Sequence, residues 1–258
     1  MEETGKNPIQ VAERLFQVIE RLAENGPMGI MDLSAELGFH KSTTHRLVTS
    51  LQYMGYIRQD EESLKYALSL KFLEIGSKIL EQTNMASLIH PSLKKLSEQT
   101  GETVHLVRRE GTEAVYIDKV ESTVSSIRMV SRVGSRIPLY CSGVGKALLA
   151  ELPDPEIEDI WNSSEIPSLT PYTVTSLSDL MDRIRGVREA GYAMDDEENE
   201  EGVRCIAVSI PDYHKEPVYA LSISAPVSRM TDARIAELST DVLTFKKDLE
   251  KTLGFSRS

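Results

Sequence analysis

Residues 33–57 read LSAELGFHKSTTHRLVTSLQYMGYI, and this stretch decides the fold of the N-terminal part of the chain. Its spacing predicts a short helix that begins near Asp32, a residue type favoured at helix N-caps, and that ends at Gly38. After a tight turn, a second helix is predicted to begin at Lys41 and to end at Gly55. Two short helices joined in this way are typical of a helix-turn-helix.

The second of these helices has one apolar face and one polar face. At 100° per residue, the apolar face consists of Leu47, Leu51 and Met54, flanked by Val48 and Thr44. The side chains that point outward or sideways are Ser42, His45, Arg46, Thr49, Gln52 and Tyr53. Residues 41–54 contain no Asp or Glu, although the whole chain has a net charge of −11. Because carboxylates repel DNA phosphates, this local absence of acids favours a helix that lies beside DNA.

The flanking residues complete a winged helix-turn-helix. Pro8 can open a preceding helix, which Gly26 and Pro27 end. The apolar stripe of that helix has helical spacing and consists of Val11, Leu15, Val18, Ile19 and Leu22. Two short extended runs, residues 56–58 and 65–68, surround a polar turn and predict a β-hairpin, the wing. This order of elements indicates DNA binding, and a protein-interaction module of the same fold is the alternative.

The composition is that of an ordinary soluble globular protein. The chain is 40% hydrophobic and 27% charged, and no apolar run reaches the ~18 residues of a membrane-spanning helix. Residues 1–6 lack the apolar core of a secretory signal, so a cytoplasmic location is expected. Cys141 and Cys205 are therefore expected to be reduced thiols. No close metal-ligand spacing is present, and no metal or cofactor is predicted.

The charge is unevenly distributed along the sequence. Residues 1–80 carry a net charge of −2, and residues 81–258 carry −9. Any DNA-binding surface must therefore be a local patch, with the acidic part of the chain held away from phosphate.

The larger C-terminal part is predicted to be an α+β domain. A helix over 85–99 precedes two alternating strands at 103–107 and 114–117. Apolar runs at 205–210 and 218–223 predict central strands. A long amphipathic helix closes the chain, with apolar positions at Ile235, Leu238, Val242, Phe245, Leu249 and Leu253.

A loop with two glycines, residues 141–145, precedes a predicted helix over 146–151. Free amides at such a loop, together with the positive end of the helix dipole, suit the carboxylate of a small organic acid. The loop is not a nucleotide-binding P-loop, because that motif requires glycine at Tyr140 and a hydroxyl residue at Ala147.

Four segments, in the same order and at similar spacing, resemble the IclR family of bacterial transcriptional regulators. They are residues 33–47 with 55–57 behind them, 134–139 running into 142–150, 191–207 and 221–226. The resemblance covers nearly the whole chain. It implies a winged helix-turn-helix at 1–68, a linker helix at 69–83 and an effector-binding domain of antiparallel sheet with flanking helices at 84–258.

The linker helix, predicted over 68–82, has apolar residues at Leu70, Leu73, Ile75, Ile79 and Leu80. The resemblance implies that such a helix also mediates dimer contacts. A helix that packs only within its own domain is the alternative.

The resemblance also implies a homodimer or tetramer that reads a near-palindromic operator in double-stranded DNA, and repression is predicted ahead of activation. The predicted DNA contacts are Lys41, Ser42, Thr43, Thr44, His45, Arg46 and Thr49 on the second helix of the motif, and Arg58 and Lys65 on the wing. Asp60, Glu61 and Glu62 occupy the tip of the wing. We therefore expect the tip to avoid DNA and its flanks to contact phosphate.

By motif matching, the effector contacts fall on Gly143, Val144, Asp195, Cys205, Ser222 and Ser224. The amides of the first two would hold the carboxylate of an oxo- or hydroxy-acid. Asp195 would accept from a hydroxyl, and the serines would bond the remaining oxygens. These residues also have structural interpretations. Cys205 would be a small buried apolar residue, and most of the acidic run 195–198 would be solvated surface.

An enzyme is the remaining alternative. It would use Cys205 or Cys141 as nucleophile and His105 or His214 as base. No motif places a histidine beside either thiol, so no catalytic residue is predicted.

Overall fold

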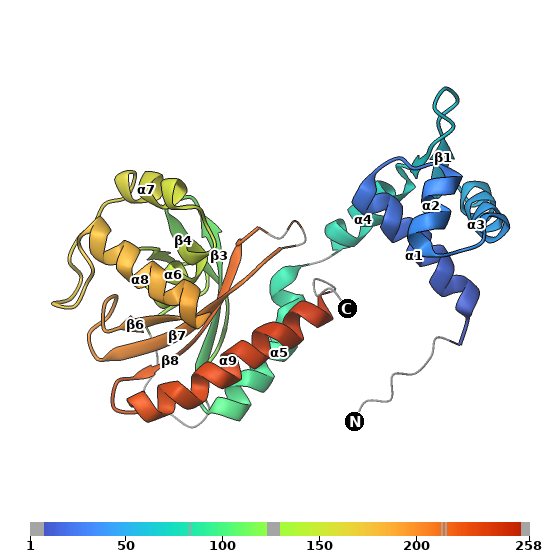
Figure 1. Cartoon of the computed structure of the whole chain (residues 1–258). Coiled ribbons are helices and arrows are strands. Elements are labelled where there is room, and N and C mark those ends of the chain that lie inside the picture. Colours follow the sequence, from blue (N-terminus) through green and yellow to red (C-terminus); the bar gives the residue numbers. More distant parts are fainter. Residues whose placement is uncertain (1–7, 83, 123–129, 213, 215, 254–258) are drawn as a thin grey trace. The chain divides into compact units, whose positions relative to one another are not determined.

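The computed structural model describes residues 8–82, 84–122, 130–212, 214 and 216–253, and the chain forms two compact units, Met1–Thr83 and Asn84–Ser258 (Figure 1). Residues 1–6, on which the expected absence of an export signal rests, lie outside the described residues. No described helix is long and apolar enough to cross a membrane. Separate hydrophobic clusters form the core of each unit.

The N-terminal unit is a winged helix-turn-helix, as predicted. Its elements are α1 (Gln10–Asn25), α2 (Ile30–Leu37), α3 (Lys41–Tyr53), β1 (Ile57–Gln59), β2 (Tyr66–Leu68) and α4 (Lys71–Gln82). The helices and the hairpin share one core, built from Val18, Leu22, Met28, Leu33, Leu47, Val48, Leu51, Ile57 and Tyr66. The backbones of Met28 and Tyr66 exchange hydrogen bonds of 3.0 and 2.8 Å, which tie the wing to the segment before α2.

The turn between α2 and α3 is fixed by its own residues. Gly38 ends α2 in the left-handed conformation, φ 64°, which glycine adopts without strain. The Ser34 hydroxyl donates to the Thr44 hydroxyl at 2.9 Å, and both side chains are buried. At the start of α3, the ring of His40 accepts a hydrogen bond from the amide of Ser42. These contacts hold α3 in place against α2.

Some details of this unit differ from the prediction. Gly29, not Asp32, is the N-cap of α2, and Asp32 lies in the first turn, where the helix dipole favours a carboxylate. Val11 and Met54 are exposed, although the spacing assigns them to apolar faces. The buried residues of α1 are Val18 and Leu22, so its first turn contributes little to the core.

The linker helix α4 begins at Lys71, later than predicted, because the preceding residues form β2 and a tight connection. The Ser69 hydroxyl donates to the carbonyl of Gly55 at 2.6 Å. The Lys71 ammonium donates to the carbonyl of Met54 at 2.8 Å and lies 4.2 Å from the ring centre of Tyr56. The start of α4 is therefore anchored to the winged helix. Of the predicted apolar positions, Leu70, Leu73 and Ile75 are exposed, and the side chains of Ile79 and Leu80 lie outside the described part.

The C-terminal unit is built on an antiparallel sheet, as predicted. Within the described residues the sheet has six strands in the order β5-β4-β3-β8-β7-β6. These are β3 (Thr103–Glu110), β4 (Glu113–Val120), β5 (Arg136–Pro138), β6 (Ala193–Asp196), β7 (Val203–Ile210) and β8 (Tyr219–Pro226). The helices are α5 (Met85–Thr100), α6 (Gly143–Ala150), α7 (Asp154–Asn162), α8 (Leu177–Ala190) and α9 (Asp232–Thr252). Helices α6, α7 and α8 cover one face of the sheet, and α5 and α9 cover the other (Figure 1).

The two faces of the central strands carry different side chains. Because successive residues of a strand point to opposite faces, each strand contributes alternately to the two layers. The face under α5 and α9 is aliphatic, with Val104, Leu106, Ile206, Val208, Leu221 and Ile223 in one buried cluster. The alternating positions, which face α6, are small or polar: His105, Cys205, Ala207, Ser222 and Ser224. This face leaves room for a cavity beneath α6.

Helix α6 begins at Gly143 rather than at Lys146, so the predicted glycine loop is the first turn of the helix. Ser142 is the N-cap, and its hydroxyl accepts from the amide of Gly145 at 3.1 Å. Gly145 packs directly on the chain that leads into the helix: a Cβ at this position would overlap the backbone of Leu139.

We expect Gly145→Ala to destabilise the C-terminal unit by about 1–3 kcal/mol or more, because the added Cβ meets backbone that cannot move aside. Urea unfolding followed by the fluorescence of Trp161, the single tryptophan, reports this unit.

Gly186→Ala is the matched control. Gly186 lies inside α8 with no atom within 4 Å of an added Cβ, so this change should stabilise by roughly 0.5–1 kcal/mol. Equal unfolding midpoints for Gly145→Ala and the wild type would contradict the close approach of α6 to Leu139.

Candidate functional site

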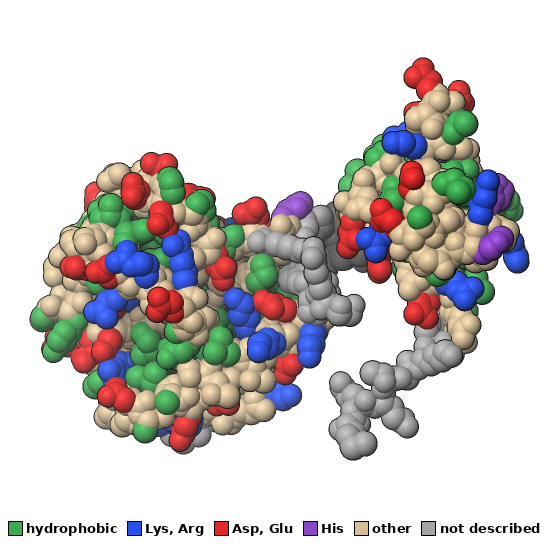
Figure 2. Space-filling model, viewed as in Figure 1, with side chains coloured by type: hydrophobic (Ala, Val, Ile, Leu, Met, Phe, Trp, Pro, Cys, Tyr) green, Lys and Arg blue, Asp and Glu red, His purple; other side chains and the backbone are tan. Residues whose placement is uncertain are grey.

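The exposed face of α3 carries most of the side chains predicted to contact DNA. Lys41, Ser42, His45, Arg46 and Thr49 are exposed, and Thr43 is half-buried. Figure 2 shows histidine and basic side chains gathered on the α3 side of this unit and acids at the tip of the hairpin. Among the described residues, no carboxylate forms an ion pair with Lys41 or Arg46, so both cations are available to an anionic partner.

Thr44 does not belong to this face. Its side chain is 0% exposed, and its hydroxyl bonds the Ser34 hydroxyl inside the core. The prediction that Thr44 contacts DNA is therefore wrong. The residue sits at the flank of the apolar face, and its hydroxyl is satisfied between α2 and α3 instead.

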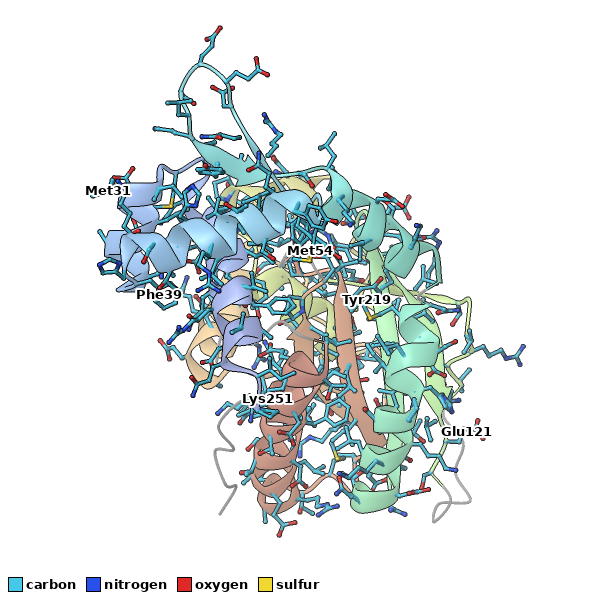
Figure 3. All side chains as sticks on the ribbon, turned by 90° about the vertical axis from the view of Figure 1, so that its right-hand side faces the viewer. Met31, Phe39, Met54, Glu121, Tyr219 and Lys251 are labelled. Carbon is cyan, nitrogen blue, oxygen red and sulfur yellow. The ribbon has the colours of Figure 1, made fainter. Side chains whose placement is uncertain are left out.

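The wing carries two exposed cations. Arg58 lies in β1, and Lys65 lies opposite Asp60 at the start of the turn, where the amide of Asp60 donates to the Lys65 carbonyl at 2.9 Å. Figure 3 shows the hairpin extending beyond α3, which runs from near Phe39 to near Met54. The Asp60 carboxylate accepts from the amide and hydroxyl of Ser63 at 2.8 and 2.7 Å, and these bonds lower the pKa of Asp60. This acid therefore stabilises the turn itself.

A cavity of about 30 Å³ lies in the C-terminal unit between the start of α6 and the polar face of the sheet. All six predicted effector residues line it: Gly143, Val144, Asp195, Cys205, Ser222 and Ser224. One enclosed water needs on the order of 10–15 Å³, so the space suits a molecule of a few non-hydrogen atoms. The fold brings residues from β6, β7, β8 and α6 to one place, although they are far apart in sequence.

The first turn of α6 offers hydrogen-bond donors to this cavity. The amides of Gly143 and Val144 precede the first intrahelical hydrogen bond, and neither has an acceptor within the part of the chain that the structure describes. A Cβ at Gly143 would lie 3.5 Å from the Cβ atoms of Ala207 and Asp195, so this turn rests directly on β6 and β7. The arrangement favours an anion, because free amides and the helix dipole act together.

Asp195 is buried at 3% exposure and fixed by backbone amides. One carboxylate oxygen accepts from the amides of Glu198 and Asn199 at 2.9 and 3.3 Å. Burial raises the pKa of Asp195 to about 7, and the nearby Lys146 ammonium opposes this rise. The Asp195 side chain therefore changes charge near neutral pH.

A buried ion pair lies beside Asp195. The Lys146 ammonium, on α6, bonds a carboxylate oxygen of Glu198, and both side chains are almost fully buried. The other oxygen of Glu198 has no partner among the described residues. The hydroxyls of Thr170 and Thr173 hold this loop by donating to the carbonyls of residues 197 and 198 at 2.6 Å each.

The expectation that most of the acidic run 195–198 is solvated is therefore wrong. Asp195 and Glu198 are buried and Glu197 is half-buried, whereas Asp196 alone is exposed and bonds Arg204. The run turns into the protein because Lys146 and the backbone amides bind its carboxylates.

The thiols are poor nucleophiles in this environment. Burial raises the pKa of Cys205, and burial also raises the pKa of Cys141 to about 12, with the neighbouring Asp195 as the next cause in both. Catalytic cysteines require the opposite shift. His214 is exposed on the connection between β7 and β8, so it is not a base for either thiol. The described residues hold no group of three or more potential metal ligands.

Sequence reasoning did not assign several other residues to this cavity, among them His105, Tyr116, Ser131 and Glu200. A signal was present for His105, because it is an imidazole among the apolar residues Val104, Leu106 and Val107, in the buried first part of β3. The Lys146–Glu198 pair was also missed, since the two residues are 52 positions apart.

The comparisons with known proteins agree with this geometry. The family model described as Bacterial transcriptional regulator IclR C-terminal matches residues 77–250, and the IclR helix-turn-helix domain matches residues 11–61. The acetate operon repressor of Salmonella typhimurium is 36% identical over 252 residues, which cover 96% of this chain and 92% of that protein. The chain belongs to the IclR family.

A further curated relative and a solved structure support the same family assignment. The HTH-type transcriptional regulator XynR of Escherichia coli is 36% identical over 248 residues, covering 96% of this chain and 98% of that protein. The crystal structure of the Thermotoga maritima IclR protein has a TM-score of 0.64 at 31% identity, covering 95% of this chain and 99% of that one. These IclR proteins are named as transcriptional regulators, not enzymes, so the chain is a DNA-binding transcriptional regulator with a C-terminal effector-binding domain.

The pKa of Asp195 predicts how stability depends on pH. The folded-state pKa of about 7 lies above the ordinary value of 3.8 for an aspartate, so the folded state holds the proton more tightly. The stability contributed by this site is present below about pH 4 and is lost as the pH rises to about 7. Relative to Asp195→Asn, the free energy of unfolding of the wild type should fall by roughly 2 kcal/mol between pH 5.5 and 7. Above pH 7 it should fall by little more.

The measurement is urea unfolding of both proteins across this range, followed by Trp161 fluorescence. A constant difference between the two proteins from pH 4 to 8 would show that Asp195 keeps an ordinary pKa in the folded protein.

Proposed function

We propose that this protein is a repressor that binds a near-palindromic operator as a homodimer or tetramer, and that a small oxo- or hydroxy-acid in the cavity beneath α6 changes its affinity for DNA. The observation that carries the proposal is the pair of free amides at Gly143 and Val144, which face a cavity of a few atoms beside Asp195. Because its target is the chromosome, we place the protein in the cytoplasm.

We assign the DNA contacts to the exposed and half-buried residues on the outer side of α3 and to the two cations of the wing. The assigned set is Lys41, Ser42, Thr43, His45, Arg46, Thr49, Arg58 and Lys65, which leaves out the buried Thr44. Arg46 is suited to a bidentate contact with guanine or to a phosphate, because its guanidinium has no acid partner among the described side chains. The acids at the wing tip repel phosphate, so we assign the phosphate contacts of the wing to Arg58 and Lys65 on its flanks.

Arg46→Ala should weaken binding to the operator by about 1–3 kcal/mol if the guanidinium contacts a base edge. The operator is first selected from genomic fragments against random competitor DNA, and its affinity is then measured by fluorescence anisotropy at several salt concentrations. A phosphate contact would instead appear as a smaller salt dependence.

Glu61→Ala on the wing tip is the control and should not weaken binding. If Arg46→Ala leaves both the affinity and the salt dependence unchanged, α3 is not the recognition helix. If the purified protein prefers no genomic fragment, with or without small acids, the operator proposal itself fails.

A second copy of this chain is the partner that best fits the N-terminal unit. Phe16 on α1 and Leu73 on α4 are 61% and 67% exposed, and Val11 and Leu70 are exposed as well. Large apolar side chains on a small unit favour association, and a two-fold dimer presents two equivalent recognition helices. Such a dimer matches half-sites one helical turn apart, about 10 bp, or a multiple of that distance.

In the cavity we assign a role to each predicted effector residue. The amides of Gly143 and Val144 bind the carboxylate, and the Asp195 oxygen not held by the backbone accepts from a hydroxyl. Ser222 and Ser224 bind the remaining oxygens, and Cys205 closes the floor between them, since it pairs with both Asp195 and Ser224 in the sheet. The effector acts by binding one arrangement of the DNA-binding units better than the other.

Gly143→Pro should abolish most of the thermal stabilisation that small carboxylic acids give to the protein. Proline removes an amide donor at the first helical position without disturbing the helix. Ser142 before it is extended, as proline requires. A hydrogen bond to a carboxylate contributes roughly 1.5–3 kcal/mol, so the affinity should fall tenfold or more.

Gly143→Ala is the control that keeps the amide, since its Cβ makes only ordinary contacts at 3.5 Å. Thermal unfolding of the full chain, followed by Trp161 fluorescence with and without glycolate, lactate or pyruvate, provides the readout. Equal responses of the proline and alanine variants would place the carboxylate elsewhere.

A further inference from the structure

His105 is a buried group in the acid-binding cavity that the proposed carboxylate site does not use. It lies in β3 at 2% exposure, on the face of the sheet that carries Ser222 and Ser224. In the sheet His105 is paired directly with Ser222, and its ring packs edge-on against Tyr116 with 5.1 Å between ring centres.

The ring of His105 is uncharged at neutral pH. Burial, with the positive charge of Lys119 as the second cause, lowers the pKa of His105 to about 3. A neutral imidazole has one N–H donor and one acceptor nitrogen. Such a ring binds hydroxyl and carbonyl oxygens, but it supplies no charge to a carboxylate.

The hydrogen bonds of His105 are unequal. Its Nε2 lies 2.7 Å from the hydroxyl oxygen of Ser131, a normal distance. Its Nδ1 is 3.4 Å from the Ser222 oxygen and 3.3 Å from the Ser224 oxygen, and these two oxygens are 3.4 Å apart. Nδ1 therefore faces two hydroxyls, and all three distances in this group are long for hydrogen bonds. An oxygen atom of a ligand would give these groups a partner at a shorter distance.

The two ends of the cavity differ in chemistry. The amides at the start of α6 lie over β6 and β7, because a Cβ at Gly143 would contact Asp195 and Ala207. His105 lies on β3, on the other side of β8 from β7, and its side chain lines the same cavity as the start of α6. A bound acid therefore has its carboxylate at one end and its other functional group towards His105.

We propose that His105, together with Ser222 and Ser224, binds an uncharged second oxygen of the effector and so selects hydroxy- and oxo-monocarboxylic acids against dicarboxylic acids and against acids with no second oxygen. This inference rests on the proposed function of the cavity. It adds a specificity-determining residue to the site and excludes a class of ligands.

The charges around the cavity support the exclusion of a second carboxylate. Asp195 and Glu200 line the same space and are themselves acidic. The two nearby lysines already bind carboxylates: Lys146 pairs with Glu198, and Lys119 with Glu121 at 3.1 Å. Among the described residues that line the cavity, a second negative group would therefore lie beside acids with no unpaired cation to neutralise it.

Four acids of three carbons test the inference on the full-length protein. Propionate has no second oxygen, lactate adds a hydroxyl, pyruvate adds an oxo group, and malonate adds a second carboxylate. Their dissociation constants are measured by isothermal titration calorimetry, with both enantiomers of lactate. We expect lactate or pyruvate to bind roughly tenfold more tightly than propionate, and malonate to bind more weakly than propionate.

His105→Leu should reduce the preference for lactate or pyruvate over propionate to about twofold or less, and the affinity for propionate should stay within about twofold of the wild type. His105→Asn, whose amide offers both a donor and an acceptor, should keep part of the preference. The double variant Ser222→Ala, Ser224→Ala should reduce the same preference. It changes the shape of the buried side chains less than His105→Leu does, so it carries the test if His105→Leu does not fold.

The outcomes separate this inference from the proposed function. If malonate binds as well as lactate, or if the preference survives both His105→Leu and the double serine variant, His105 does not select the effector, while the carboxylate site stands. If none of the four acids binds the wild type, or if Gly143→Pro binds propionate as well as Gly143→Ala does, the proposed carboxylate site itself is wrong.

Discussion

The alternation of side chains along the central strands is the constraint on which the effector unit depends. Residues in β3, β7 and β8 place large aliphatic groups on the face under α5 and α9, and small or polar groups on the face under α6. The first face stabilises the unit by burying apolar surface. The second face cannot be filled by its own side chains, and the space that remains is lined with hydroxyl, imidazole and carboxyl groups. Stability and ligand binding are thus divided between two sides of one sheet.

Helix α6 brings its amides to this space because contacts at both of its ends fix its position. Gly145 approaches the backbone of Leu139 more closely than any other residue type could, and Ser142 caps the helix while donating to the carbonyl of Pro138 at 2.5 Å. At the other end of the helix, Arg188 donates to the carbonyls of Ala150 and Leu152 at 2.9 and 2.7 Å. The orientation of the anion-binding turn is therefore set by packing and hydrogen bonds outside the cavity.

Much of the fold follows from local patterns in the sequence, and most of the site does not. Periodicity predicts α1, α3 and α9, because each has an apolar stripe with helical spacing. The same reasoning fails at Thr44, since a wheel position at the flank of an apolar face does not say whether a neighbouring hydroxyl is present. It also misses the Lys146–Glu198 pair and the contact of His105 with Ser222 and Ser224, because these depend on strand order and pairing. The six effector positions came from resemblance, not from local pattern.

The buried pair of Lys146 and Glu198 has a consequence for how this protein can evolve. Loss of either partner alone strands an uncompensated charge in the interior, which is strongly unfavourable, whereas exchange of both for apolar residues of similar volume is often tolerated. Substitutions at the two positions are therefore non-additive, and natural variants should change them together or not at all. Because of this epistasis, the substitutions that are tolerated in α6 depend on the sequence of the loop after β6. Sequence change on one side of the cavity is therefore limited by the residues on the other side.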